Sequence, residues 1–172
     1  MNATDILKYG HRTVLRTLED VPDNEWETPG VCGVSSVKEI IAHLASFEHM
    51  LVDLLTSFVS RDPVATTYLD QYQEMGLAFN DRQVALRKDK TPGQVLAEYR
   101  DTQAKNMMLI AQIPVETLHR AGALPWYGME YDLEDFIVYT FYGHKREHMA
   151  QINVFKDTLK LTGRMNKKPA AQ

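Results

Sequence analysis

The sequence predicts an all-α protein built as a four-helix bundle, with a long connection between the second and third helices. Apolar residues recur at alternating spacings of three and four over long segments, which is the period of an amphipathic helix. Two segments open with capping boxes, Ser36 to Glu39 and Thr91 to Gln94, which are typical of helix N-termini. The chain lacks the convincing period-two alternation that a half-buried strand would show.

The first two predicted helices carry the clearest apolar seams. The first runs from about Thr4 to Leu18, with Thr4 as its expected cap, and it stops before Pro22. The second begins after Ser36. Its apolar residues follow a bundle spacing of four, three, four, three and four; they are Ile40, Leu44, Phe47, Leu51, Leu54 and Phe58.

The other two long helices follow a connection of roughly thirty residues, which permits a crossover between helices. The connection opens at Asp62-Pro63 and is expected to contain a short helix over 68–86. The third long helix begins at Thr91 and ends before Pro114, and the fourth runs over about 132–160.

Length and composition favour one domain. With 172 residues and no linker-like segment, the chain is expected to form a single domain over 1–165, followed by a flexible C-terminal tail at 166–172. The net charge of −4, with acids and bases interspersed, argues against a nucleic-acid partner. The single cysteine, Cys32, fits a reducing compartment, and we expect a cytoplasmic protein with no membrane span.

Three histidines fall on inward faces of the predicted helices. His144 and His148 lie about 40° apart on a helical wheel, among apolar residues of the fourth helix. His43 lies between Ile40 and Phe47 on the second helix. An unpaired buried polar group costs roughly 1–3 kcal/mol, and one shared divalent metal would satisfy all three rings while leaving open coordination positions. The alternative is that each ring hydrogen-bonds to a backbone carbonyl or a nearby acid.

The remaining histidines are expected to lie elsewhere. His11 shares a face with Leu7 and Val14, so it could serve as a fourth ligand or as a pocket residue, and we expect it at the edge of the bundle. His49 is expected to face outward, and His119 to be exposed in a loop. The string "HKREH" also fits an inverted zinc-peptidase motif with Glu147 as the base, but no glutamate follows His148 to supply the third ligand, which excludes that reading.

The segments "SSVKEIIAHLASFEH" and "GHKREHMAQI", in this order, resemble the DinB/YfiT-like superfamily of metal-dependent four-helix bundles. The resemblance extends over roughly residues 4–160. It implies that His43, His144 and His148 are metal ligands and that the ion is nickel or zinc. It also implies enzymes that use a low-molecular-weight thiol such as bacillithiol or mycothiol for S-transfer, or that act as hydrolases, and it suggests a homodimer.

Two functions remain open on the sequence. The first is a metal-dependent enzyme for a small-molecule substrate, with Trp126 and Tyr127 as a pocket wall or as core residues. Cations that could receive a thiol cofactor are Arg12, Lys145 and Arg146, although we expect these three side chains to be solvated surface charges. The second is a non-catalytic metal-binding or stress-response module. A stripe on the fourth helix, formed by Val138, Tyr142 and Met149, is expected either to meet a neighbouring helix or to form a two-fold dimer interface.

Overall fold

The computed structural model describes residues 2–165, and over that range the protein is all-helical, as predicted. Residues 2–165 contain no strand beyond an isolated bridge between Cys32 and Ser35. The helices are α1 (Ala3–Leu18), α2 (Val37–Val59), α3 (Thr67–Met75), α4 (Ala78–Ala85), α5 (Pro92–Ile110), α6 (Val115–Leu118), α7 (Leu133–Ile137) and α8 (His144–Leu161). The predicted tail at 166–172 lies outside the described residues.

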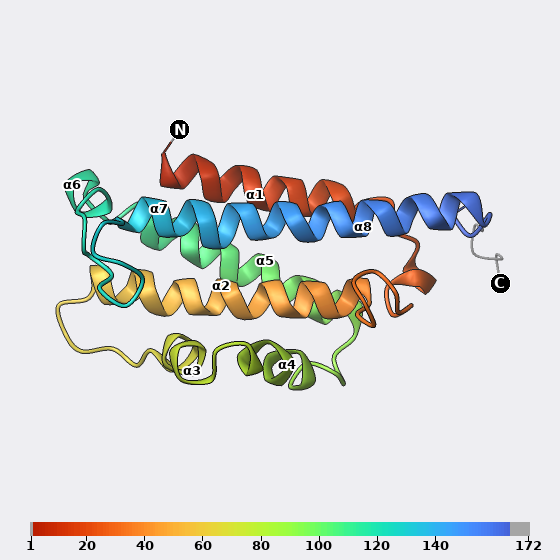
Figure 1. Ribbon diagram of the computed structural model, residues 1–172, viewed down its shortest axis with the longest axis horizontal. Coiled ribbons are helices and arrows are strands. Elements are labelled where there is room, and N and C mark those ends of the chain that lie inside the picture. The colour runs from red at the N-terminus through yellow and green to blue at the C-terminus, as the bar shows by residue number, and fades with distance from the viewer. Residues whose placement is uncertain (1, 166–172) are drawn as a thin grey trace.

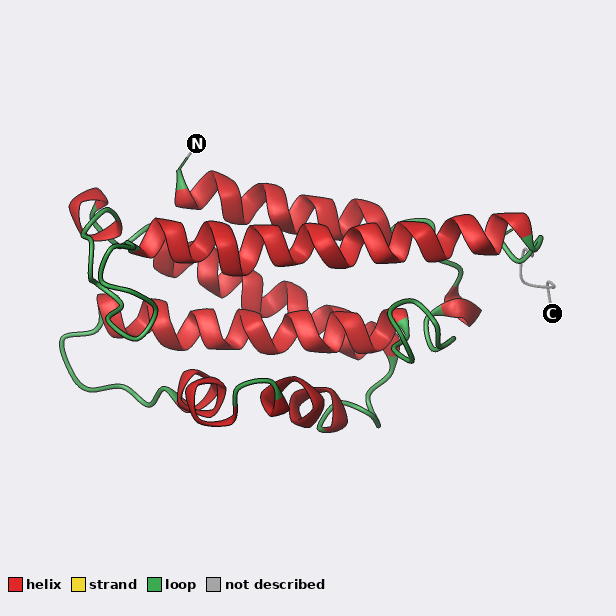
Figure 2. Ribbon diagram, viewed as in Figure 1, coloured by secondary structure: helices red, strands yellow, loops and turns green. Residues whose placement is uncertain are grey.

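The four longest helices pack lengthwise against one another. α1 lies beside α8 and α2 lies beside α5, while α1 also contacts α5 and α2 also contacts α8 (Figure 1). The short helices α3 and α4 pack on the side of α2 that faces away from α1 and α8 (Figure 2). Neighbouring helices therefore cover α2 on several sides, which leaves little of its surface for solvent.

Local capping determines where the long helices begin. Both predicted capping boxes are confirmed, because Ser36 and Thr91 each accept from the backbone of the residue three positions later. The prediction of Thr4 as the first cap was wrong. Asn2 has the extended backbone of a cap, and its side chain accepts from the backbone amide of Asp5 at 2.9 Å.

The predicted continuous helix over 132–160 is interrupted. A π-helical turn at Val138–Gly143 joins α7 to α8. Such a turn adds a residue to the α-helical repeat, so residues before and after it do not share one helical wheel. The connecting segment also differs from the prediction, because its helix is divided into α3 and α4 at Gly76, whose φ of +55° is strained for any other residue.

The core consists of two apolar clusters separated by a polar layer. One cluster contains Leu7, Leu51 and Phe141, and the other contains Val14, Ile41 and Met149. Between these levels the helices carry the buried side chains of Glu48, Asn106 and Lys145. The amide of Asn106 donates to the Glu48 carboxylate at 2.8 Å, and Lys145 Nζ lies 2.5 Å from the same carboxylate.

Among the described helices, none combines the length and the apolar character that crossing a membrane would require.

Candidate metal centre

The three sequence-predicted histidines meet at one point between α2 and α8. His43 Nε2 lies 2.7 Å from His144 Nε2, and His148 Nε2 lies 2.9 Å from the same atom. One ligand nitrogen from each ring lies within 4.8 Å of the other two. The spacing of four residues places His144 and His148 on adjacent turns of α8, and the packing of α8 on α2 brings His43 to them.

The chemistry of these nitrogens fits a cation better than a set of hydrogen bonds. A neutral imidazole nitrogen carries either one proton or one lone pair, so His144 Nε2 can form a hydrogen bond with only one of its two neighbours. The other close nitrogen is then left without a partner inside the cluster. Three lone pairs directed at one divalent ion resolve this conflict, and imidazole suits zinc and nickel.

Neighbouring groups orient two of the rings. His148 Nδ1 lies 2.8 Å from Gln151 Oε1, which can only accept, so Nδ1 carries the proton and Nε2 keeps its lone pair for the cluster. The ring of His144 is held by a hydrogen bond to the backbone of Thr140, in the π-helical turn. Sequence reasoning did not assign a role to Gln151, although its position three residues after His148 places it within reach on the same helix face.

Burial keeps His43 and His144 neutral at physiological pH. Burial, followed by the proximity of His148, lowers the pKa of His43 to about 4. Burial, followed by His43, His148 and Lys145, lowers the pKa of His144 to about 3, against a raising effect of the Thr140 hydrogen bond. Metal ligation requires neutral imidazole, so these two rings need to release no proton to bind a metal at pH 7.

The metal-free protein should lose stability between pH 7 and pH 5. In this window the unfolded chain protonates His43 and His144 near their ordinary pKa of 6.5, whereas the folded protein does not until about pH 4 or 3. Stability is therefore complete above pH 6.5 and falls as the pH falls, because the unfolded state binds more protons. We expect a decrease of about 4 kcal/mol in the free energy of unfolding, because each of the two rings contributes about 1.4 kcal/mol per pH unit over about 1.5 units below pH 6.5; urea titration in the presence of a chelator measures it.

The matched control for this pH dependence is the double variant His43→Ala/His144→Ala. It should show a flatter stability profile between pH 7 and pH 5, because it lacks the two rings with lowered pKa values. An unchanged slope in the double variant would assign the pH dependence to other groups.

The histidine cluster opens into a pocket of about 350 Å³. Its walls come from Glu39 and Phe47 of α2, from Asn80, Asp81 and Val84 of α4, and from Glu147 of α8. Cys32, exposed in the loop before α2, also contributes to the pocket lining. The histidine nitrogens are therefore accessible to a small molecule from one side, and α4 forms part of the entrance.

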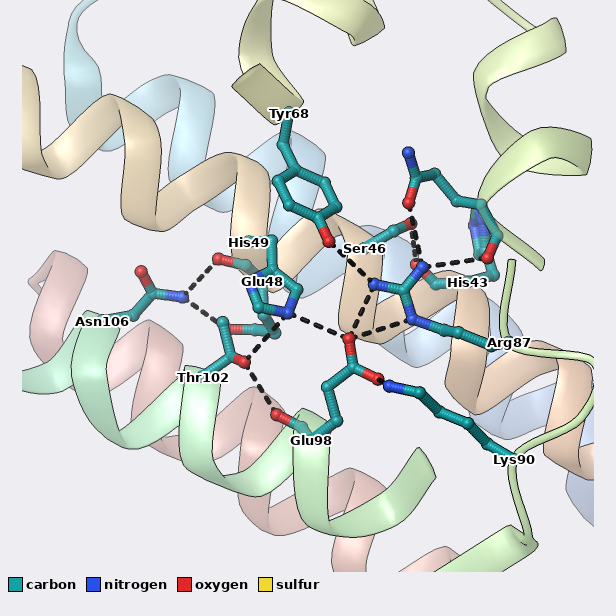
Figure 3. A network of polar contacts seen from close by, with 11 residues as sticks. His43, Ser46, Glu48, His49, Tyr68, Arg87, Lys90, Glu98, Thr102 and Asn106 are labelled. Carbon is teal, nitrogen blue, oxygen red and sulfur yellow. Dashed lines mark hydrogen bonds and ion pairs between the residues drawn. The ribbon is translucent and has the colours of Figure 1, made fainter. Parts of the chain in front are cut away.

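His49 does not face outward as predicted. Its Nε2 lies 3.0 Å from Glu98 Oε1, and its ring stacks on Tyr68 at a centroid distance of 4.6 Å. Figure 3 shows His49 within a polar network that also includes Arg87 and Lys90. The prediction was wrong because it assumed that α2 buries only the face that carries its apolar seam. The helices α3 and α5 also contact α2 and cover further faces of it.

The same network perturbs Glu98. Burial raises the pKa of the Glu98 carboxyl, but hydrogen bonds from His49, Arg87 and Lys90 outweigh it and hold the pKa well below its ordinary value. This network joins α5 and the segment after α4 to α2 (Figure 3).

Two further histidines lie apart from the cluster. His11 Nδ1 is 3.4 Å from the Tyr99 hydroxyl, so it is a half-buried residue of the polar layer and is not among the clustered histidines. His119 is exposed and pairs with Asp132 and Glu134, at 3.4 Å and 3.1 Å. The expectation for His119 is confirmed, and the proposal of His11 as a fourth ligand finds no support in the geometry.

The cations expected near a thiol cofactor lie elsewhere. Lys145 is buried against Glu48, which excludes the sequence interpretation of a solvated surface charge. Arg12 lines a separate surface groove with Arg16 and Tyr142. The Arg146 guanidinium lies over the Tyr142 ring, 5.7 Å from its centroid.

The two aromatic residues before the fourth helix pack away from the histidine pocket. Trp126 and Tyr127 lie edge-on to Phe136, with centroid distances of 5.4 Å and 4.9 Å. Neither residue lines the histidine pocket, so both are packing residues and not part of a pocket wall.

The apolar stripe on the fourth helix packs largely against other residues of the same chain. Met149 is buried in one apolar cluster, and Val138 and Tyr142 pack against the other. These contacts correspond to the first alternative, a stripe that meets a neighbouring helix. The homodimer stays a prediction.

Comparison with known proteins finds a matching family whose model covers the histidine site. A family model described as the DinB superfamily matches residues 6–152, a span that includes all three clustered histidines. No curated protein and no solved structure shows a significant match to the chain.

Proposed function

The chain belongs to the DinB superfamily, and from this premise we propose that it binds one divalent metal ion through His43, His144 and His148. The observation that carries the proposal is the convergence of three Nε2 atoms from two helices. The Gln151 contact, which keeps the lone pair of His148 free, supports the same assignment. Nickel and zinc are the ions we favour, because both bind imidazole well.

We further propose that the centre is catalytic. Three protein ligands leave at least one coordination position for a water or a substrate atom, as in catalytic zinc sites. A bound divalent cation would lower the pKa of a thiol or water in that position towards neutrality. The pocket beside the histidines is large enough for a small molecule, with Phe47 and Val84 as apolar walls. The reaction classes we propose are thiol S-transfer and hydrolysis.

The remaining architecture is part of the proposal. We interpret α1, α2, α5 and α8 as a four-helix bundle within a single domain over 1–165, and α3 and α4 as the long connection between its second and third helices. The mutual contacts of these four helices support that interpretation. In this arrangement the metal ligands come from the second and fourth bundle helices, which is a common way to build a metal site in a bundle.

Elemental analysis of protein prepared without an affinity tag tests the proposal. We expect about one nickel or zinc ion per chain, removable by a chelator and restored by either metal, because the site offers three converging imidazoles. Loaded protein is then screened for thiol transfer and hydrolysis. Metal with turnover supports the enzyme, metal without turnover favours a non-catalytic metal-binding module, and absence of metal after reloading contradicts both.

A further inference from the structure

The charges that line the histidine pocket are all negative. Carboxylates enter the pocket wall from three helices, with Glu39 on α2, Asp81 on α4 and Glu147 on α8. None of the described residues that line this pocket is a lysine or an arginine. The pocket therefore differs from one built to receive a carboxylate- or phosphate-bearing molecule, for which arginine is the usual partner.

Three of the nearby cations are held by other acids and are not free to turn into the pocket. Lys145, beside His144 in sequence, is 2% exposed and lies 2.5 Å from Glu48 Oε1. Lys38 and Arg87 line a neighbouring surface depression, where they pair with Glu27 at 2.6 Å and with Glu98 at 2.7 Å. Moving a buried, paired cation out of its ion pair would leave its partner carboxylate uncompensated, which is costly.

The charge of a bound metal does not reverse this preference. A divalent ion contributes +2 and three neutral imidazoles contribute nothing, while Glu39, Asp81 and Glu147 contribute a formal −3, so +2 − 3 leaves −1. A thiolate bound in the open position would neutralise one further unit of the metal's positive charge. The rest of that ligand, which extends away from the metal between α4 and α8, therefore meets an excess of negative charge.

Building on the proposed function, we propose that this pocket selects a small molecule that binds the metal through a sulfur or oxygen atom and carries a cationic group on a short arm. Asp81 and Glu147 supply the attraction for the cation. Thiols whose arms carry carboxylate groups are disfavoured by the same charges. Asp81 and Glu147 are then specificity-determining residues.

Three thiols with the same two-carbon arm test this selection on cobalt-loaded protein. They are thiocholine, which is cationic, 2-mercaptoethanol, which is neutral, and 2-mercaptoethanesulfonate, which is anionic. Each is titrated while the thiolate-to-cobalt absorption band is followed, so the readout is binding and not turnover. After correction for the pKa of each thiol, we expect thiocholine to bind about tenfold more tightly than the sulfonate, with the difference shrinking as salt is raised from 0.05 to 0.5 M.

Charge-matched variants identify the residues responsible. Asp81→Asn/Glu147→Gln should lower the ratio of the two affinities about fivefold, because it removes two of the three pocket carboxylates. Asp101→Asn/Glu116→Gln makes the same change in net charge at exposed positions outside the pocket, and it should leave the ratio unchanged. Comparing ratios between variants cancels the intrinsic differences among the thiols.

The outcomes separate the two proposals. Stoichiometric cobalt binding with no charge preference, or with a preference that the pocket variant does not change, overturns the selection and leaves the metal site intact. A preference for the sulfonate overturns it as well. Failure of the protein to bind cobalt, shown by the missing d–d bands, contradicts the metal site and with it this inference.

Discussion

His144→Ala should abolish stoichiometric metal binding at pH 7 while the protein stays folded. His144 Nε2 is the central atom of the cluster, within 3 Å of the ligand nitrogens of both His43 and His148. Without it, two imidazoles on different helices remain. Because changes to residues that merely orient a ligand already cost 10–100-fold in affinity, we expect loss of the ligand itself to cost more than about 100-fold. Competition with a chromophoric chelator measures the affinity, and circular dichroism checks the fold.

The other residues of the site provide graded controls for this prediction. His43→Ala should resemble His144→Ala, whereas His119→Ala should retain full affinity, because His119 is exposed and pairs with Asp132 and Glu134. Gln151→Ala should fall between them, since it frees the ring of His148 without removing a ligand. Equal metal binding in His144→Ala and His119→Ala would contradict the assignment of the ligands.

Glu48→Ala should destabilise the protein by about 3–5 kcal/mol, because it leaves the Lys145 ammonium buried and without its anion. Lys145 Nζ lies 2.5 Å from Glu48 Oε1, and both side chains are shielded from solvent. The stem of Lys145 reaches this position past Gly10 of α1, where a Cβ atom would lie 3.2 Å from Lys145 Cδ. Urea unfolding of the metal-free protein at pH 7 measures the change.

The double variant Glu48→Leu/Lys145→Met is the control that separates charge burial from packing. Replacing a buried ion pair with apolar residues of similar volume is often neutral or stabilising, so the double variant should regain most of the lost stability. A loss of less than about 1 kcal/mol in Glu48→Ala would show that water reaches the Lys145 ammonium. A double variant as unstable as Glu48→Ala would instead assign the loss to packing.

Much of the fold was predictable because its signals are local. The capping boxes at Ser36 and Thr91 depend on residues three positions apart, and both occur where they were predicted. The inward faces of α2 and α8 follow from the helical repeat, which is why His43, His144 and His148 could be placed together before their contact was known. The resemblance to the DinB superfamily, also based on these segments, is confirmed.

The errors have a common physical origin. His49 was placed outward because the helical wheel assumes a single buried face, whereas α2 is also contacted by α3 and α5. Lys145 was interpreted as a surface charge because nothing local indicates that Glu48, 97 positions earlier, lies within 2.5 Å of its ammonium group. The break in the fourth helix at Val138–Gly143 was missed because a π-helical turn has no clear sequence signal.

The sequence by itself determined the helical class, the starts of α2 and α5 and the inward direction of the three histidines, because these depend on interactions within one or two turns of helix. The tertiary structure decided that the three Nε2 atoms share one point, that α4 forms the pocket entrance, and that carboxylates surround the opening. Those properties depend on how distant helices pack, so they are set by contacts between segments that no local pattern records.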